Sequence, residues 1–194
     1  MEQLKERIRR EGKVLPGNII KVDGFLNHRV DTKLLNDIAD EFARYFDISR
    51  ITTVLTAEAS GIALATVCAQ KFGVPMLFAK KAKSDNIESG LYQSEVFSYT
   101  YKKKVTLLVS QEWLHADDHV LIIDDFMANG FAMQGLVDIV NAAGATLEGI
   151  GVAVEKGFQG GGDKFRAMEG VRYKALAVIE KADENGIIFR GDEE

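Results

Sequence analysis

Two adjacent aspartates, Asp124 and Asp125, stand where a run of apolar residues ends, in the stretch LIIDDFMANGFA (121–132). Two carboxylates this close repel each other unless a cation or hydrogen-bond donors relieve them. A sugar diol supplies such donors, because each carboxylate accepts two hydroxyl hydrogens, and a hydrated magnesium ion is another suitable partner. The chemistry indicated is recognition of a ribose or of a metal-bound ligand.

The loop after the acids, Ala128-Asn129-Gly130, is made of small residues and leads into a run with helical periodicity. Backbone N–H groups at a helix N-terminus, together with the helix dipole, bind anions such as phosphate. Acids that bind a diol, followed by a phosphate cradle, indicate a ribose 5-phosphate. On the residues alone, a plain strand–turn–helix whose acids cap the helix or form ion pairs remains an alternative.

Other patterns match less well. A P-loop needs G-x-x-x-x-G-K-[ST] and a dinucleotide site needs G-x-G-x-x-G; both are absent, and Gly160-Gly161-Gly162 lacks the spacing. A receiver domain uses clustered acids as a phosphoryl acceptor, but the small loop directly after the acids argues against one. The sequence offers no convincing catalytic triad.

Strands and helices alternate through the middle of the chain and must position these residues. The strands are apolar runs, which predicts a parallel sheet covered by helices on both faces. In such folds ligands bind at the carboxyl ends of the strands. The expected strands are 51–56, 74–81, 119–125 and 148–157, with residues 173–182 and 186–190 giving one or two final strands. The expected helices are 2–11, 32–46, 62–72 and 130–144, with a short helix after the glycine-rich loop that follows residue 157.

Two segments depart from the alternation. Residues 14–31 contain turn residues and are expected to be irregular, with Thr32 capping the helix that follows. Residues 82–110 alternate polar and apolar positions around Lys102–Lys104, which predicts a hairpin arm.

Composition narrows the class of protein. The chain has 194 residues, of which 46% are apolar, enough for the core of one domain. Its net charge of −5 argues against a generally basic nucleic-acid surface. The single cysteine, Cys68, is expected to be a buried thiol. With no signal-peptide pattern and no apolar run near the length of a membrane span, a soluble protein of a reducing compartment is expected.

Apolar residues, two acids, a short turn, a glycine and a helix together resemble the phosphoribosyl-diphosphate motif of the type I phosphoribosyltransferases. With FLNH (25–28) upstream and VEKGFQ (154–159) downstream, the stretch IIDDFMANG (122–130) is most similar to the bacterial members that act on xanthine. The resemblance covers essentially the whole chain. Many members have threonines in the phosphate loop, whereas this chain has ANGFA, so backbone amides and the Asn129 side chain would bind the phosphate.

The resemblance implies an α/β fold of the type I phosphoribosyltransferase kind, with a parallel five-stranded sheet and helices on both faces. It implies a single domain, 1–194, with a small N-terminal hood of about residues 1–30 and a flexible arm of about residues 82–110. It also implies a cytoplasmic homodimer, with FLNH and the arm supplying the interface, and no nucleic-acid or membrane partner.

The implied reaction transfers a phosphoribosyl group from phosphoribosyl diphosphate to N9 of xanthine, with Mg²⁺ as the cofactor. Hypoxanthine–guanine or adenine as the accepted base is an alternative, and so is a regulator that binds phosphoribosyl diphosphate without catalysis. An acidic chain that begins with a single mixed-charge helix is a poor match for such a regulator.

The resemblance also assigns roles to residues. Asp124 and Asp125 would be the catalytic residues that hold the ribose diol and stabilise charge on the sugar. The other implied positions are Ala128, Asn129, Gly130, Phe131 and Ala132 for the 5′-phosphate, Ala59, Ser60, Gly61, Lys80 and Lys81 for pyrophosphate, and Ile20, Asn27, Lys156 and Phe158 for xanthine.

The base positions make physical sense. A dioxopurine presents two carbonyl acceptors and ring N–H donors; the Asn27 amide both donates and accepts, and Lys156 donates to a carbonyl or to N7. Lys156 also favours partly ionised xanthine. Ile20 would supply an apolar wall and Phe158 would stack on the ring. His28, beside Asn27, is expected to be a structural or surface histidine.

Plainer alternatives stay open for several positions. Ser60 would look the same as the N-cap of a helix. Lys80 and Lys81 would look the same as solvated lysines, and Lys83 is a weaker candidate for the pyrophosphate. In the arm, Tyr99 and Lys102–Lys104 are candidates to reach the site.

Overall fold

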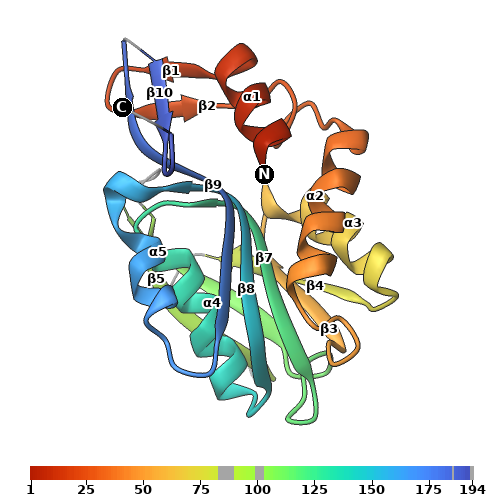
Figure 1. The fold of residues 1–194 in the computed structure, drawn as a ribbon. Coiled ribbons are helices and arrows are strands. Elements are labelled where there is room, and N and C mark those ends of the chain that lie inside the picture. Colours follow the sequence, from red (N-terminus) through yellow and green to blue (C-terminus); the bar gives the residue numbers. More distant parts are fainter. Residues whose placement is uncertain (83–89, 99–102, 185, 193–194) are drawn as a thin grey trace.

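The computed structural model describes residues 1–82, 90–98, 103–184 and 186–192. Figure 1 shows the elements in chain order. They are α1 (Glu2–Glu11), β1 (Lys13–Leu15), β2 (Ile19–Lys21), α2 (Thr32–Tyr45), β3 (Thr53–Ala57), α3 (Gly61–Phe72), β4 (Met76–Ala82), β5 (Leu91–Ser98), β6 (Lys103–Ser110), β7 (His119–Met127), α4 (Phe131–Ala142), β8 (Thr146–Lys156), the 3₁₀ turn η1 (Gly157–Gln159), α5 (Gly161–Arg166), β9 (Arg172–Asp183) and β10 (Gly186–Phe189).

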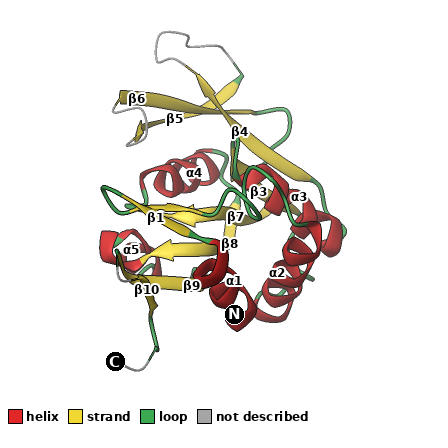
Figure 2. Cartoon of the chain, turned by 90° about the horizontal axis from the view of Figure 1, so that it is seen from above, coloured by secondary structure: helices red, strands yellow, loops and turns green. Residues whose placement is uncertain are grey.

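The main sheet has, in the described part of the chain, eight strands in the order β10-β9-β8-β7-β3-β4-β6-β5. Strands β9, β8, β7, β3 and β4 are parallel to one another, which confirms the five parallel strands expected. β10 at one edge and β6 and β5 at the other add antiparallel strands. Seen from above, α2 and α3 lie on one side of the sheet and α4 and α5 on the other (Figure 2).

The apolar run of β7 explains why the strand is buried on both faces. Leu121 and Ile123 pack in the cluster that α1, α2 and α3 supply, whereas Val120 and Ile122 pack in the cluster that α4 supplies. All four side chains have no exposed surface. Successive side chains of a strand point to opposite faces, so a strand between two helical layers needs apolar residues at every position.

Three local expectations were wrong. Residues 14–31 are not irregular throughout, because β1 and β2 pair antiparallel, with Val14 opposite Ile20. The cap of α2 is Asp31 rather than Thr32, since the Asp31 carboxylate accepts a hydrogen bond of 3.1 Å from the Leu34 amide. β7 continues to Met127, so both acids lie inside the strand and not at its end.

β1 and β2 lie beyond the end of the sheet at which β7 and β8 finish, above the strand ends (Figure 1). Phe25 and Leu26 follow them and are each 1% exposed in the core, so the expectation that FLNH supplies an apolar dimer interface was wrong.

The arm contains the expected hairpin, with β5 and β6 antiparallel from Leu91↔Ser110 to Ser98↔Lys103. Lys83, Tyr99 and Lys102 lie outside the described residues. Among the described helices, none combines the length and apolarity that crossing a membrane requires.

Candidate active site

The two adjacent acids are both buried in β7. Asp124 is 9% exposed and Asp125 is 4% exposed, and the Asp125 amide donates to Asp124 Oδ1 at 2.9 Å. Burial raises the pKa of Asp124 well above its usual value, and the neighbouring Asp125 raises it further; Lys81 partly offsets this effect. A carboxylate held in this way gains from any ligand that brings hydrogen-bond donors or positive charge.

Asp125 joins three segments that are distant in sequence. Ser60 Oγ donates to Asp125 Oδ1 at 2.9 Å, and Asn27 Nδ2 donates to Asp125 Oδ2 at 2.7 Å. Asn27 comes from the hood, Ser60 from the turn before α3 and Asp125 from β7. The structure therefore brings together one residue from each of the groups predicted for base, pyrophosphate and ribose.

The turn between β3 and α3 carries the predicted pyrophosphate residues. Ala59 and Ser60 are exposed, and the peptide bond between Glu58 and Ala59 is cis. Ser60 occupies the N-cap position of α3, yet in the described chain its hydroxyl makes no cap hydrogen bond and donates to Asp125 instead. Gly61 is buried, and a Cβ there would come within 2.5 Å of Asp124 Oδ1. This turn is consequently packed directly against the acids.

The two predicted lysines of β4 point to opposite faces of the sheet. The Lys81 amide donates to Glu58 Oε1 at 2.6 Å, and its charge acts on Asp124, so this lysine belongs to the neighbourhood of the acids. Lys80 instead lines a cavity of about 450 Å³ together with Leu108 of β6 and Trp113. The structure thus places Lys81, and not Lys80, beside the acids.

The predicted phosphate loop begins α4. Gly130 precedes the helix with φ of 83°, in the left-handed region that glycine tolerates best. The loop therefore leads into the N-terminus of α4, where the positive end of the helix dipole favours an anion.

The glycine-rich segment 160–162 packs against this loop. The Gly161 amide donates to Ala128 O at 3.2 Å, and a Cβ on Gly130 would approach the Phe165 ring to 3.0 Å. A Cβ on Gly161 would collide with the carbonyl oxygen of Ala128. The triple glycine was the visible signal for this close packing, which was missed because its spacing matches no dinucleotide motif.

The predicted base residues lie on different elements. Lys156 ends β8, is half-buried, and its ammonium group is 5.8 Å from the Phe126 ring centroid. Burial lowers the pKa of Lys156, so the lysine is not simply solvated. Phe158, in η1, is 36% exposed and available for stacking. Ile20, in β2 of the hood, is 7% exposed and packs in the hydrophobic core. His28 is exposed, as expected.

An ion pair between a buried glutamate and a half-buried arginine side chain, beside Lys156, was missed. Glu155 has no exposed surface; its Oε2 accepts from Arg166 and, at 2.8 Å, from the Tyr173 hydroxyl. Its Oε1 has no hydrogen-bond partner within the described chain. The pair fastens α5, which carries the glycines behind the phosphate loop, to β8. A glutamate inside the apolar run GVAVEK was the available signal, because a buried charge needs a partner.

Magnesium is compatible with the acids but is not enclosed by protein. The described residues contain no group of three or more histidine, cysteine, aspartate or glutamate side chains able to hold a metal ion. Magnesium keeps several waters and takes one or two carboxylates together with substrate phosphates. Asp124 and Asp125 fit that pattern through water.

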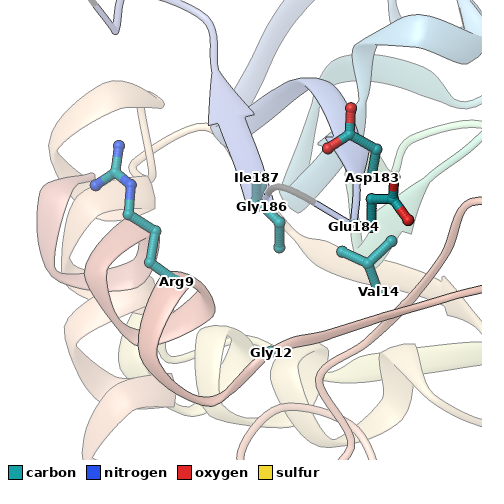
Figure 3. A pocket seen from close by; sticks show the side chains of 7 residues that line it. All are labelled: Arg9, Gly12, Val14, Asp183, Glu184, Gly186 and Ile187. Carbon is teal, nitrogen blue, oxygen red and sulfur yellow. The ribbon is translucent and has the colours of Figure 1, made fainter.

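A pocket of about 440 Å³ lies elsewhere, between the end of α1 and the β9–β10 hairpin (Figure 3). Arg9 is its cationic group, and it is held by the Asp192 carboxylate at 2.7 Å and 2.8 Å. None of the residues predicted for the site lines this pocket. The lining residues are Arg9, Gly12, Val14, Asp183, Glu184, Gly186 and Ile187.

The parallel sheet carries the two acids in its central strand β7, followed by the loop before α4, so the candidate site lies at the carboxyl ends of the strands, where ligands bind in such folds. The phosphoribosyl transferase domain family model matches residues 24–176, and the chain belongs to this family.

Curated relatives match over nearly the whole chain. The chain is 49% identical over 194 residues to a xanthine phosphoribosyltransferase of Lachnoclostridium phytofermentans, covering 99% of this chain and 100% of the relative. It is 52% identical over 193 residues to a xanthine phosphoribosyltransferase of Bifidobacterium longum, covering 98% and 100%.

Solved structures share the fold. An adenine phosphoribosyltransferase of Giardia lamblia complexed with 9-deazaadenine has a TM-score of 0.75 and 20% identity, covering 92% of this chain and 98% of that one. The enzyme of Trypanosoma brucei in complex with AMP, pyrophosphate and ribose-5-phosphate has a TM-score of 0.72 and 21% identity, covering 90% and 78%. These structures confirm the type I phosphoribosyltransferase fold expected from the sequence.

Proposed function

We propose that this protein transfers the 5-phosphoribosyl group from phosphoribosyl diphosphate to N9 of xanthine, releasing pyrophosphate and forming xanthosine 5′-monophosphate. The observation that carries the proposal is the hydrogen bond of 2.7 Å between Asn27 and Asp125, two residues that are 98 positions apart in the sequence. A transfer reaction needs the accepting base next to the sugar carbon that it attacks. This contact joins the residue assigned to the base with the residue assigned to the ribose.

The sugar would be held by its hydroxyls and its phosphate. Asp124 and Asp125 accept hydrogen bonds from the diol, and their negative charge stabilises positive charge that develops on the sugar in the transition state. The 5′-phosphate lies on the backbone amides of residues 128–132, which Gly161 supports from behind.

The leaving pyrophosphate would lie on the turn formed by residues 59–61, with Lys81 nearby. Small side chains at this turn let backbone amides approach an anion closely. When bound, Mg²⁺ supplies charge neutralisation of the pyrophosphate, with Asp124 and Asp125 as its protein partners through water.

The base would lie between the hood and the end of β8. Lys156 donates to a carbonyl or to N7 of the purine, Asn27 hydrogen-bonds its edge, and Phe158 stacks on the ring. Ile20 contributes to the apolar floor of the hood. The half-buried position of Lys156 strengthens its attraction for partly ionised xanthine, because charges interact more strongly away from water.

The protein is further proposed to be a cytoplasmic homodimer of one domain, residues 1–194. With Phe25 and Leu26 buried, the apolar contact surface would come from the arm region, where Trp113 is 62% exposed beside β4, β5 and β6.

The test is formation of xanthosine 5′-monophosphate and pyrophosphate from xanthine, phosphoribosyl diphosphate and magnesium. The wild-type protein is expected to form both products in equal amounts. In the variant Lys156→Met, kcat/KM for xanthine is expected to fall about 10²-fold or more. Lys80→Met, whose side chain faces the other side of β4, is the matched control and should change turnover little. Tight binding of phosphoribosyl diphosphate without product would favour a regulator instead.

A further inference from the structure

The phosphate loop of residues 128–132 is supported by a helix that has little stability of its own. α5 has six residues, and two of them, Gly161 and Gly162, are glycines, which disfavour the helical conformation. A helix this short does not form without tertiary contacts. The position of α5, and of the loop that it supports, is therefore set by the groups that hold α5 in place.

α5 contacts the loop through its first residue. The Gly161 amide donates to Ala128 O at 3.2 Å. A Cβ on Gly161 would come within 2.2 Å of that oxygen and 2.6 Å of the Gly130 nitrogen, so the two backbones lie in direct contact. Further along α5, the ring of Phe165 lies 3.0 Å from the position of a Cβ on Gly130. A shift of α5 would therefore move the backbone amides that are proposed to bind the 5′-phosphate.

The other end of α5 is held by two strands of the sheet. Arg166, the last residue of α5, donates to Glu155 Oε2 in β8, and its guanidinium lies 4.9 Å from the ring centroid of Tyr173 in β9. The Tyr173 hydroxyl donates to the same Glu155 oxygen at 2.8 Å. The Glu155 side chain has no exposed surface, whereas that of Arg166 is 31% exposed. Arg166 thus joins α5 to a carboxylate that is fixed inside the sheet.

Stability alone gives no reason for a carboxylate at position 155. A buried ion pair often contributes no more than apolar side chains of similar volume would, because both charges lose their hydration. This pair is also incomplete, since within the described part of the chain Glu155 Oε1 has no hydrogen-bond partner. The pair differs from apolar packing in its geometry, because hydrogen bonds are directional and the hydrophobic effect is not.

We infer that Arg166 and Glu155 are positioning residues for the 5′-phosphate, because their ion pair fixes α5 and so aligns the amides of the phosphate loop. This role rests on the proposed function and goes to two residues that the proposed function does not use. Neighbouring side chains of a strand point to opposite faces. The end of β8 therefore positions both ends of the nucleotide, with Lys156 on the face of the base and Glu155 on the face of α5.

The test compares the dissociation constants of xanthosine 5′-monophosphate and xanthosine, measured by calorimetry. The two compounds differ only in the 5′-phosphate, and the wild-type protein should bind the monophosphate more tightly. In Arg166→Met this preference is expected to fall about tenfold or more, because displaced amides lose their alignment with the phosphate oxygens. The dissociation constant of xanthosine should change little.

Two further variants separate positioning from stability. Asp163→Asn removes the other carboxylate that Arg166 contacts, at 2.8 Å within α5, and leaves the contact with β8 intact, so the preference should match wild type. Arg166→Met combined with Glu155→Met removes the unpaired buried charge and should recover much of the melting temperature lost in Arg166→Met. The preference for the monophosphate should stay low in this combined variant, which also decides the matter if Arg166→Met alone does not fold.

A preference that is unchanged in Arg166→Met, that falls equally in Asp163→Asn, or that recovers with the melting temperature in the combined variant overturns the positioning role and leaves the proposed function standing. A wild-type protein that transfers no phosphoribosyl group to xanthine contradicts the proposed function instead. Inosine 5′-monophosphate and inosine, measured in the same variants, then test the positioning role by itself.

Discussion

Gly61 lies directly against Asp124, so that a Cβ at position 61 would come within 2.5 Å of Asp124 Oδ1 and would also collide with Thr56 Oγ1. The pyrophosphate turn and the acid pair are therefore packed as one unit. Gly61→Ala is expected to destabilise the protein by about 1–3 kcal/mol through overpacking and to reduce turnover. Gly24→Ala, where nothing lies within 4 Å of the added Cβ, should match wild type. Urea unfolding and initial rates measure both effects, and equal behaviour of the two variants would contradict the packing argument.

Removing the charge of Asp124 should raise the folding stability of the protein while lowering its catalytic turnover. The folded-state pKa of Asp124 lies well above its usual value of 3.8 because of burial and Asp125. The protonated form is therefore favoured by folding, and this contribution is present at low pH and lost as pH rises through the raised pKa. At neutral pH the ionised side chain lowers stability, so Asp124→Asn is expected to raise the melting temperature by about 2–4 °C for each kcal/mol relieved.

The gain of Asp124→Asn should shrink as pH is lowered toward the raised pKa, because the wild-type side chain then becomes neutral too. Melting curves between pH 8 and pH 4 measure this trend. Asp117→Asn, an exposed aspartate in the loop before β7, serves as the control and should shift little. A lower melting temperature for Asp124→Asn at neutral pH would show that the carboxylate stabilises the fold.

The ion pair of buried Glu155 with half-buried Arg166 should contribute more to stability than a surface pair. Arg166→Met leaves a fully buried carboxylate without its cation and is expected to cost about 3–5 kcal/mol of unfolding free energy. Arg44→Met, which removes the exposed pair with Glu41, should cost about 0–1 kcal/mol. Denaturant unfolding of both variants measures the free energy of unfolding. Similar small decreases in the two variants would mean that another group compensates the charge of Glu155.

Cys68 should be unreactive in the native protein. The thiol has no exposed surface, and burial raises its pKa, so little thiolate is available to react. Treatment with a thiol-specific reagent is expected to label Cys68 only as the protein unfolds in urea. Glu112→Cys, in the exposed loop after β6, provides a thiol that reacts at once under the same conditions. Rapid native labelling of wild type would contradict the burial of α3.

The sequence predicted what is encoded locally. β7 and its acids could be recognised because an apolar run followed by charge is a feature of neighbouring residues, and a parallel sheet could be predicted from the alternation of strands with helices. The cap of α2 was placed one residue late because Asp31 and Thr32 are both good N-caps. The short strands β1 and β2 were missed because proline, glycine and asparagine dominate their turn.

Contacts between distant segments could not be predicted in the same way. Nothing near Asn27 indicates that its partner is Asp125, and Glu155 signals a buried charge without revealing Arg166. Lys80 and Lys81 look equivalent in sequence, and only the register of β4 separates them. Tertiary packing determines these contacts, and local sequence patterns do not indicate which distant residues will meet.

The most direct test of the account is a competition for one limiting supply of phosphoribosyl diphosphate. Xanthine, guanine, hypoxanthine and adenine are mixed at equal concentrations with magnesium and the wild-type protein, and the four monophosphates are separated and measured early in the reaction. Their proportions equal the ratios of kcat/KM. The account predicts that xanthosine 5′-monophosphate is the main product. A mixture dominated by another monophosphate would contradict it.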